Sequence, residues 1–183
     1  MLTRFEVVGG NATIHGQHLC ISSDGKIHIA APSKADDDKI ALAKPIGSSP
    51  GVLAVVSTTA SGQEHSTTST NLFYCLEGSS GKGSYRLSAR SDDSTFGMGW
   101  QVKRDGWEVV DDEGMTGRHL LRWNEKVRAN SWLAVKASDV EGEAGRWEVW
   151  LIAPNAANMD DFEEYKLIDI VAVEVDGAGR DVE

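Results

Sequence analysis

The sequence predicts an all-β protein, and three observations support this: short apolar runs that alternate with polar residues, turn-forming residues between the runs, and no long amphipathic helix. The chain has 183 residues, of which 40% are hydrophobic and 25% charged, as is ordinary for one globular domain with a real core. Side chains two positions apart lie on the same face of a strand, so alternation marks a half-buried strand. The stretches between the runs, such as SSDG, GSSGKG and DDEG, favour turns.

The apolar runs recur in three similar units. Three opening stretches, KIHIAAPSKADDD, SYRLSARSDDS and WLAVKASDVEGE, begin at Lys26, Ser84 and Trp132. Their alternation aligns three sets of positions, which are Ile27, Tyr85 and Leu133, then Ile29, Leu87 and Val135, then Ala31, Ala89 and Ala137. Because each set falls on one strand face, Ile29, Leu87 and Val135 are expected to be buried together.

Each unit contains three further short runs at comparable places. They lie at 18–22, 73–77 and 119–123 before the opening stretches, at 39–44, 99–104 and 146–151 after the polar loops, and at 52–56, 107–110 and 166–173 at the ends of the units. Three units of four strands predict a β-trefoil, a six-stranded barrel capped by three hairpins, and a β-sandwich is the alternative. The prediction is a single domain over residues 1–183, with repeats at about 11–60, 70–115 and 117–175 and a loop insertion at 153–164.

The strand pattern of residues 10–175 resembles the β-trefoil superfamily, and within it the fascin-like and ricin-B-like lectin domains. GQHLCISSDGKIHIA (16–30) is similar to the fascin-type repeat opening, G-x-x-L followed by D-G-x-[IV]. RWEVWL (146–151) falls where ricin-B-type lectins carry their Q-x-W motif, although no unit here contains a true Q-x-W. The resemblance implies a carbohydrate-binding protein, but the missing motif means that the sugar-binding positions of ricin-type lectins are not carried over.

The charge of the chain argues against several classes of partner. The formal net charge is -10 and the pI is about 4.9, whereas nucleic-acid binding requires a basic surface. No run approaches the roughly eighteen apolar residues that a membrane-spanning helix needs. The N-terminal residues also lack the apolar core of a signal peptide. We therefore expect a cytoplasmic protein with no nucleic-acid partner and no membrane insertion.

The two cysteines fall at equivalent places in the first two units. Cys20 and Cys75 both lie within apolar runs, and Leu121 takes the same place in the third unit. A packing role is the ordinary reading of such a position, and a reducing compartment disfavours disulfides. Both cysteines are therefore expected to be reduced and buried.

Catalytic and metal-binding constellations are not recognisable in the sequence. His18 and Cys20 would share a strand face, but no second pair of ligands has matching spacing. There is no G-x-S-x-G elbow and no EF-hand loop, and the paired carboxylates lie in predicted turns. We therefore expect a protein that is not an enzyme and that holds no metal or other cofactor.

The tryptophans are concentrated in one part of the chain. All six lie between positions 100 and 150, and they are Trp100, Trp107, Trp123, Trp132, Trp147 and Trp150. Trp100 and Trp147 occupy the position that Ile40 fills in the first unit. These two rings are therefore expected to belong to the core.

A sugar-binding site is predicted from the remaining aromatic residues. An exposed aromatic ring stacks on the apolar C–H face of a sugar, while nearby polar groups bind its hydroxyls. Trp107 follows an RDG turn, where exposure is expected, and Trp123 precedes a polar loop. Trp107, Asp111, Trp123 and Asn124 therefore form the predicted ligand-binding site for glycans or glycoproteins, and the alternative is that these rings only fill the barrel.

Two other functions are compatible with the same fold. A protease inhibitor of the β-trefoil type would present an exposed loop to an enzyme cleft, and the stretches at 57–70 and 154–161 are long enough. A fascin-like cytoskeletal binding module is the third candidate, although the acidic charge suits an acidic filament poorly. Fold alone does not decide between these functions.

Overall fold

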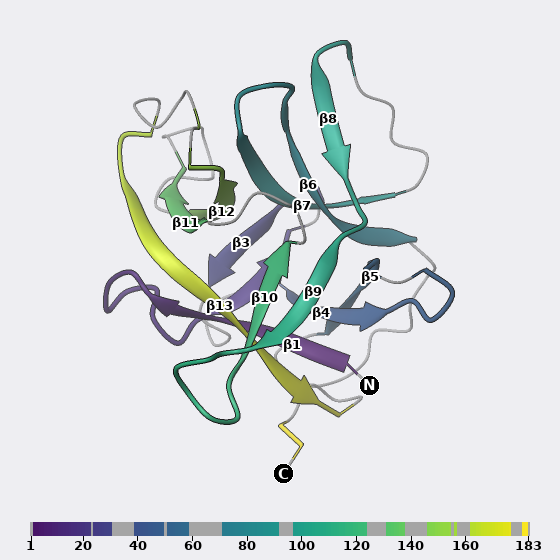
Figure 1. Cartoon of the computed structure of the whole chain (residues 1–183), viewed down its shortest axis with the longest axis vertical. Helices are drawn as coiled ribbons and strands as arrows, with labels where there is room; N and C mark the ends of the chain where they lie inside the picture. Colours follow the sequence, from purple (N-terminus) through teal and green to yellow (C-terminus); the bar gives the residue numbers. More distant parts are fainter. Residues whose placement is uncertain are drawn as a thin grey trace.

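The regular secondary structure of the chain consists of β-strands in the part that the structure describes. The computed structural model describes residues 2–22, 24–30, 39–49, 51–58, 71–91, 97–123, 131–137, 146–154, 156, 162–176 and 181–182. Within these ranges it contains 13 strands and no helix (Figure 1). The predicted all-β class is therefore confirmed.

The pairings between the strands are antiparallel. Twelve strands follow the short apolar runs of the sequence, whereas the strand at residues 2–9 precedes the predicted repeats and was not predicted. In chain order they are β1 (Leu2–Gly9), β2 (His18–Ile21), β3 (Ile27–Ala30), β4 (Lys39–Pro45), β5 (Leu53–Thr58), β6 (Leu72–Ser79), β7 (Ser84–Ser91), β8 (Trp100–Lys103), β9 (Trp107–Asp111), β10 (His119–Trp123), β11 (Ser131–Lys136), β12 (Trp147–Ile152) and β13 (Tyr165–Val175).

Three hairpins, β2–β3, β6–β7 and β11–β12, meet through their second strands. Strand β12 pairs with both β3 and β7, and a single bridge joins the start of β3 to β7. The three contacts are equivalent, because each strand uses two positions that are two residues apart, one for each of its neighbours. The paired residues are His28 with Glu148, Trp150 with Arg86, and Ser88 with Lys26. The residues between these positions, Ile27, Leu87 and Val149, are buried at 1%, 0% and 0% exposure.

Six further strands form a second series. Strand β1 pairs with β13 and β4, β4 pairs with β5, and β10 pairs with β13 and β9. Strands β5 and β9 lie at the two ends of this series. The Trp107 N–H, at the start of β9, donates at 3.0 Å to the carbonyl of Gly51, in the turn before β5. A Cβ atom on Gly51 would lie 2.9 Å from the Gly106 nitrogen, so glycine permits this close approach.

The predicted alignment of the third unit is wrong in two respects. Residues 119–123 pair with β9 and β13, whereas β2 and β6 pair with the strands that follow them. In β11 it is Trp132 and Ala134 that face the main core, and Leu133 and Val135 belong to a second cluster. A shift of one residue moves every side chain to the opposite face, so aligning on Leu133 instead of Trp132 inverted the strand. Val135 is buried, but not with Ile29 and Leu87.

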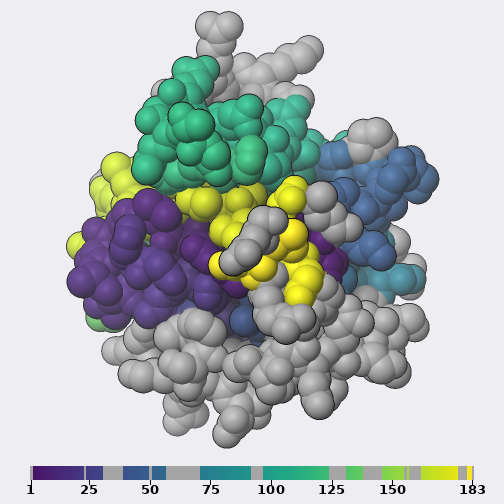
Figure 2. Space-filling model, turned by 90° about the horizontal axis from the view of Figure 1, so that it is seen from below, coloured from purple at the N-terminus to yellow at the C-terminus, as the bar shows by residue number. Residues whose placement is uncertain are grey.

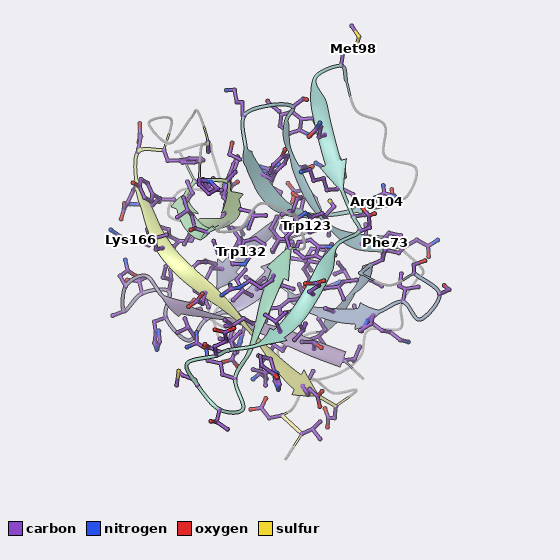
Figure 3. The ribbon with its side chains drawn as sticks, viewed as in Figure 1. Phe73, Met98, Arg104, Trp123, Trp132 and Lys166 are labelled. Carbon is purple, nitrogen blue, oxygen red and sulfur yellow. The ribbon has the colours of Figure 1, made fainter. Side chains whose placement is uncertain are left out.

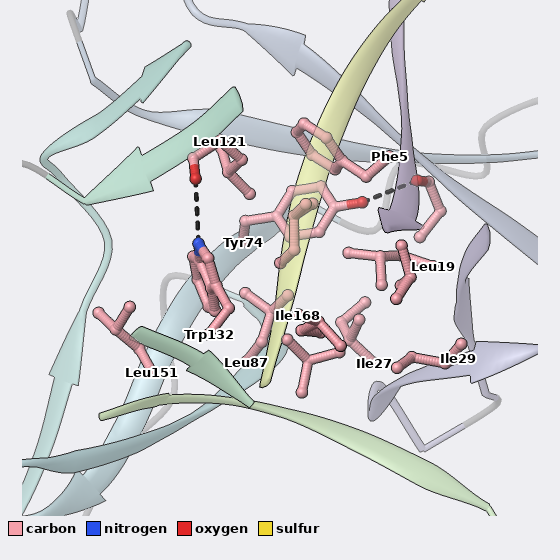
Figure 4. Close-up of a cluster of buried hydrophobic side chains, with 14 of the residues drawn as sticks. Phe5, Leu19, Ile27, Ile29, Tyr74, Leu87, Leu121, Trp132, Leu151 and Ile168 are labelled. Carbon is pink, nitrogen blue, oxygen red and sulfur yellow. Dashed lines mark hydrogen bonds between the residues drawn. The ribbon is translucent and has the colours of Figure 1, made fainter. Parts of the chain in front are cut away.

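The main core is built around aromatic rings. The Trp107 ring stacks on Trp132 with a centroid distance of 6.3 Å and an interplanar angle of 4°. The Trp132 indole N–H donates to the Leu121 carbonyl at 3.0 Å, and the Tyr74 hydroxyl donates to the Ala41 carbonyl at 2.8 Å. Dashed lines mark these hydrogen bonds at Trp132 and Tyr74 (Figure 4). These bonds satisfy the polar atoms that would otherwise make the burial of large rings costly.

The expectation that Trp100 and Trp147 are core residues is confirmed for one and wrong for the other. Trp147 is 7% exposed and belongs to the main core, whereas Trp100 is 43% exposed. Strand β8 pairs with β6 in the part of the chain that is described, and it projects from the body of the molecule (Figure 1). Met98, just before it, is fully exposed at the tip (Figure 3).

Both cysteines are free thiols and both are buried, as predicted. Cys75 lies on β6, and its thiol donates to the Ser88 carbonyl at 3.5 Å. Burial raises the pKa of the Cys75 thiol to about 12. It is therefore an inert packing residue at neutral pH.

Candidate functional site

The two tryptophans of the predicted sugar site lie in the core. Trp107 and Trp123 are paired across β9 and β10, with ring centroids 4.6 Å apart and the planes at 85°. They are only 4% and 8% exposed. The Trp107 indole N–H donates to the Tyr74 carbonyl at 3.2 Å, which fixes the ring inward. The expected exposure of Trp107 is wrong, and neither ring offers a face to a sugar.

The polar members of the predicted site are not assembled around these rings. Asp111 is four positions along β9 from Trp107, or about 13 Å at the usual strand rise. Its side chain is 89% exposed, and its carboxylate lies 2.8 Å from Nδ1 of His119. Asn124 lies outside the described residues. The loops proposed for protease inhibition, 57–70 and 154–161, also lie largely outside them.

An apolar surface covers the outer side of β11, β12 and β13. Leu133, Val135 and Ile152 point away from the main core and are nevertheless buried. Leu133 pairs with Leu167 on one neighbouring strand and with Trp150 on the other. A sheet that is apolar on both faces needs cover on both, because exposed apolar area is unfavourable.

The segment predicted as a loop insertion supplies part of that cover. Ala156 and Phe162, which belong to the 153–164 stretch, pack against the outer cluster. The Phe162 ring contacts Trp150 edge to face, with centroids 5.1 Å apart. Ala156 and Phe162 therefore form part of a second packing layer over this part of the sheet.

A pocket is lined by residues of β11, β12 and β13, and we call it the outer pocket. Its volume is about 250 Å³, and it is lined by Ser131, Leu133, Ile152, Ala153, Pro154, Tyr165 and Leu167. Tyr165 is 42% exposed and Leu167 is 66% exposed, so an aromatic ring and an aliphatic side chain stand open to solvent. The hydroxyls of Ser131 and Tyr165 are the polar side-chain groups of the lining. The outer pocket therefore combines an accessible ring, an apolar floor and two hydroxyls.

An ion pair links the end of β11 to the residue that precedes Tyr165. The ammonium group of Lys136 lies 3.2 Å from the Glu164 carboxylate, and the backbone N–H of Lys136 donates to the Glu164 carbonyl at 3.0 Å. Both side chains are more than 40% exposed, at 46% and 41%. An exposed pair of this kind contributes little to stability. The backbone hydrogen bond between Lys136 and Glu164 holds the chain in place immediately before Tyr165.

A network of charges lies beside this surface, on the outer face of β6, β7 and β12. The Glu77 carboxylate accepts hydrogen bonds from Ser88 at 2.7 Å, Arg86 at 2.7 Å and Arg90 at 2.9 Å. Arg86 also reaches Glu148 at 3.3 Å, and Glu148 accepts from the Trp150 indole N–H at 3.1 Å. Every carboxylate oxygen of Glu77 is bonded within the protein, so the network acts as a structural link and not as an open binding site.

Burial alone would raise the pKa of Glu77. Hydrogen bonds from Ser88 and Arg86, with the charges of Arg86 and Arg90, instead hold it below its ordinary value of 4.5. Sequence reasoning missed this network. The available signal was one carboxylate at the end of an apolar run, facing a second run whose arginines fall four residues apart.

The described ranges contain neither a group of metal ligands nor a helix that could span a membrane. No three His, Cys, Asp or Glu side chains in those ranges gather closely enough to hold a metal ion. Among the same residues, no helix has the length and apolar character needed to cross a membrane. Comparison with family models, with curated proteins and with solved structures finds no significant match to this chain.

Proposed function

We propose that the chain adopts a β-trefoil architecture. The three hairpins β2–β3, β6–β7 and β11–β12 would be the caps, because β3, β7 and β12 contact one another in three equivalent ways. Strands β1, β4, β5, β9, β10 and β13 would form the barrel, which the Gly51–Trp107 backbone bond would close. This grouping differs from the repeats expected from sequence, because β10 belongs to the barrel.

We further propose that the protein is a non-enzymatic carbohydrate-binding protein and that its glycan binds at the outer pocket. The observation that carries this proposal is the Tyr165 ring, 42% exposed at the rim of a pocket with an apolar floor. Sugars are mostly uncharged and well hydrated, so binding depends on a flat ring together with fixed hydrogen-bonding groups. The Tyr165 and Ser131 hydroxyls supply the polar side-chain groups of the lining.

The proposal is tested by substituting the ring. The unmodified protein is screened on a broad glycan array, and glycans that bind are titrated against Tyr165→Ala and Tyr165→Phe. Loss of a stacking contact is worth about 1 kcal/mol, so Tyr165→Ala should weaken binding several-fold. Tyr165→Phe keeps the ring and removes only the hydroxyl, so it should lose less affinity than Tyr165→Ala.

A matched control is available in Trp100, which is 43% exposed on β8 and distant from the outer pocket in sequence and strand order. Trp100→Ala should leave glycan affinity unchanged. If Trp100→Ala abolishes binding and Tyr165→Ala does not, the site is on β8. If no glycan binds at high protein concentration, carbohydrate binding is rejected. Protease inhibition and fascin-like cytoskeletal binding stay predictions, which a protease panel and a filament cosedimentation assay would address.

A further inference from the structure

The two edges of β9 are occupied differently. Strand β9 pairs with β10 along its whole length, from Trp107 opposite Trp123 to Asp111 opposite His119. The ladder continues past the strand, where the Asp112 N–H donates to the Arg118 carbonyl at 2.8 Å. In an antiparallel pair, hydrogen-bonded residues alternate with residues whose backbone groups point away. The even-numbered residues of β9 therefore bond to β10.

The odd-numbered residues of β9 direct their N–H and C=O groups to the other side. We call these residues, Trp107, Val109 and Asp111, the outer edge of β9. The Trp107 N–H confirms this direction, because it donates to the Gly51 carbonyl in the turn before β5 and not to β10. In the described part of the chain, that bond is the single backbone link of this edge. Val109 and Asp111 thus offer two N–H and two C=O groups along a strand edge.

A pocket lies beside this edge, and we call it the seam pocket. Its volume is about 210 Å³, and it opens between β9 and the turn that joins β4 to β5. Apolar side chains dominate its walls, including Ile46, Val52, Leu53 and Val109. Val109 is 49% exposed, so the seam pocket is accessible from solvent. In Figure 2 the blue β4–β5 region and the teal β9–β10 region meet on the face seen from below.

The surroundings of the edge are acidic. The segment 105–113 contains five carboxylates, and they are Asp105, Glu108, Asp111, Asp112 and Glu113. Arg118 lies 3.3 Å from Asp112 and compensates part of this charge. Asp111, at the end of the edge, is 89% exposed. Since the whole chain also carries a net charge of -10, this edge favours a cationic partner.

We propose that the outer edge of β9 binds an extended, basic peptide segment of a partner protein as an added β-strand. Backbone groups of the segment pair with Val109 and Asp111, one apolar side chain enters the seam pocket, and a lysine or arginine lies near Asp111. Strand addition of this kind takes affinity from backbone hydrogen bonds and specificity from side-chain pockets. The inference concerns a different surface from the outer pocket and does not depend on glycan binding.

The test uses two synthetic peptides with acetylated and amidated ends, TKTVTKT and its acidic counterpart TETVTET. Each is titrated into the isotope-labelled full chain, and backbone amide shifts and amide hydrogen exchange are recorded. The basic peptide should shift and protect the Val109 and Asp111 amides. It should also bind about three- to tenfold more tightly than the acidic one, as expected for a few exposed charge contacts. Equal responses to both peptides, or shifts confined to other strands, would overturn the proposal.

Two variants separate strand addition from general charge attraction. Val109→Pro removes an N–H that points away from β10, so no bond to β10 is lost. Proline is tolerated at such a position of an edge strand. It should abolish protection at the outer edge, whereas Val109→Thr should retain it. Asp111→Lys leaves the backbone intact and should remove the preference for the basic peptide. If Val109→Pro does not fold, Asp111→Lys and the exchange map of the unmodified chain still decide, since an unchanged preference or an unprotected edge contradicts the proposal.

Discussion

A guanidinium nitrogen of Arg86 lies 2.7 Å from a carboxylate oxygen of Glu77, whose side chain is completely buried. The same arginine reaches Glu148 at 3.3 Å, so one side chain joins β6, β7 and β12. Buried ion pairs are costly to break because the remaining partner keeps its charge without compensation. The three strands are thus held together by a polar link on the outer face and by apolar packing on the inner face.

Removing the charge of Glu77 should strongly destabilise the protein. Glu77→Gln keeps the shape of the side chain but removes the carboxylate that Arg86 and Arg90 share. Because Arg86 keeps Glu148 and both arginines are partly exposed, the free energy of unfolding should fall by about 2–3 kcal/mol. Glu164→Gln is the matched control, since Glu164 forms an exposed pair with Lys136 and should cost less than about 1 kcal/mol. Chemical denaturation of both variants measures the difference. Similar losses in the two would show that the Glu77 network has no special role.

The same network predicts a dependence of stability on pH. The pKa of Glu77 in the folded state is below its ordinary value of 4.5, so the folded protein binds the proton less readily than the unfolded chain. Glu77 therefore contributes stability that is present above pH 4.5 and is lost as pH falls through the lower, folded-state pKa. Desolvation acts to raise the pKa of Asp24, but hydrogen bonds from Ser22 and Lys26 outweigh it and lower that pKa, so Asp24 contributes in the same direction.

Comparison with Glu77→Gln isolates the contribution of Glu77. Between pH 6 and about pH 3.5, the melting temperature of the unmodified protein should fall more steeply than that of the variant, because the glutamine does not titrate. Parallel curves would mean that Glu77 takes up its proton equally in both states. The measurement needs only thermal unfolding followed by circular dichroism in a series of buffers.

The contrast between Trp107 and Trp100 gives a third prediction. Trp107 is 4% exposed and stacks on Trp132, so Trp107→Ala should lower the free energy of unfolding by about 3–5 kcal/mol. Trp100 is 43% exposed, and Trp100→Ala should cost less than about 1 kcal/mol. Urea denaturation followed by fluorescence distinguishes the two. A large loss on removal of Trp100, with a small loss for Trp107, would reverse the assignment of core and surface.

The strands were predictable from sequence wherever alternation was clear. Trp147, Glu148 and Val149 alternate between apolar and polar, and Trp147 and Val149 point inward as expected. SWLAVK instead carries four consecutive apolar residues, from Trp132 to Val135, so its pattern does not say which two face the core. In the structure they are shared between two clusters, because both faces of β11 are covered. A local pattern cannot reveal cover supplied by residues 20 or more positions away.

The orientation of the rings in the predicted sugar site also depends on residues that are far away in the sequence. The sequence places Trp107 after a turn, but Tyr74 and Trp132 decide its orientation, and they are far away in the chain. The sequence did not indicate that Tyr165 lines a pocket, because a tyrosine at the start of an apolar run is usually an ordinary strand residue. Its 42% exposure and its place beside Leu133 and Leu167 depend on how β11 and β13 pair, which only the folded chain determines.

The contact between the β4–β5 turn and the start of β9 gives the last prediction, which compares two glycines of that turn. Gly51 has φ of +77°, and a Cβ atom there would lie 2.9 Å from the backbone nitrogen of Gly106. Gly51→Ala would therefore be strained both by its conformation and by the close approach, and should cost about 1–3 kcal/mol. Gly47 has no unusual φ, and a Cβ atom added there would meet nothing within 4 Å, so Gly47→Ala should be neutral or stabilising by up to about 1 kcal/mol. Equal stability of the two variants would contradict this close contact. Because the Trp107 N–H bonds to Gly51, faster exchange of the Trp107 amide in Gly51→Ala, but not in Gly47→Ala, should accompany the loss of stability.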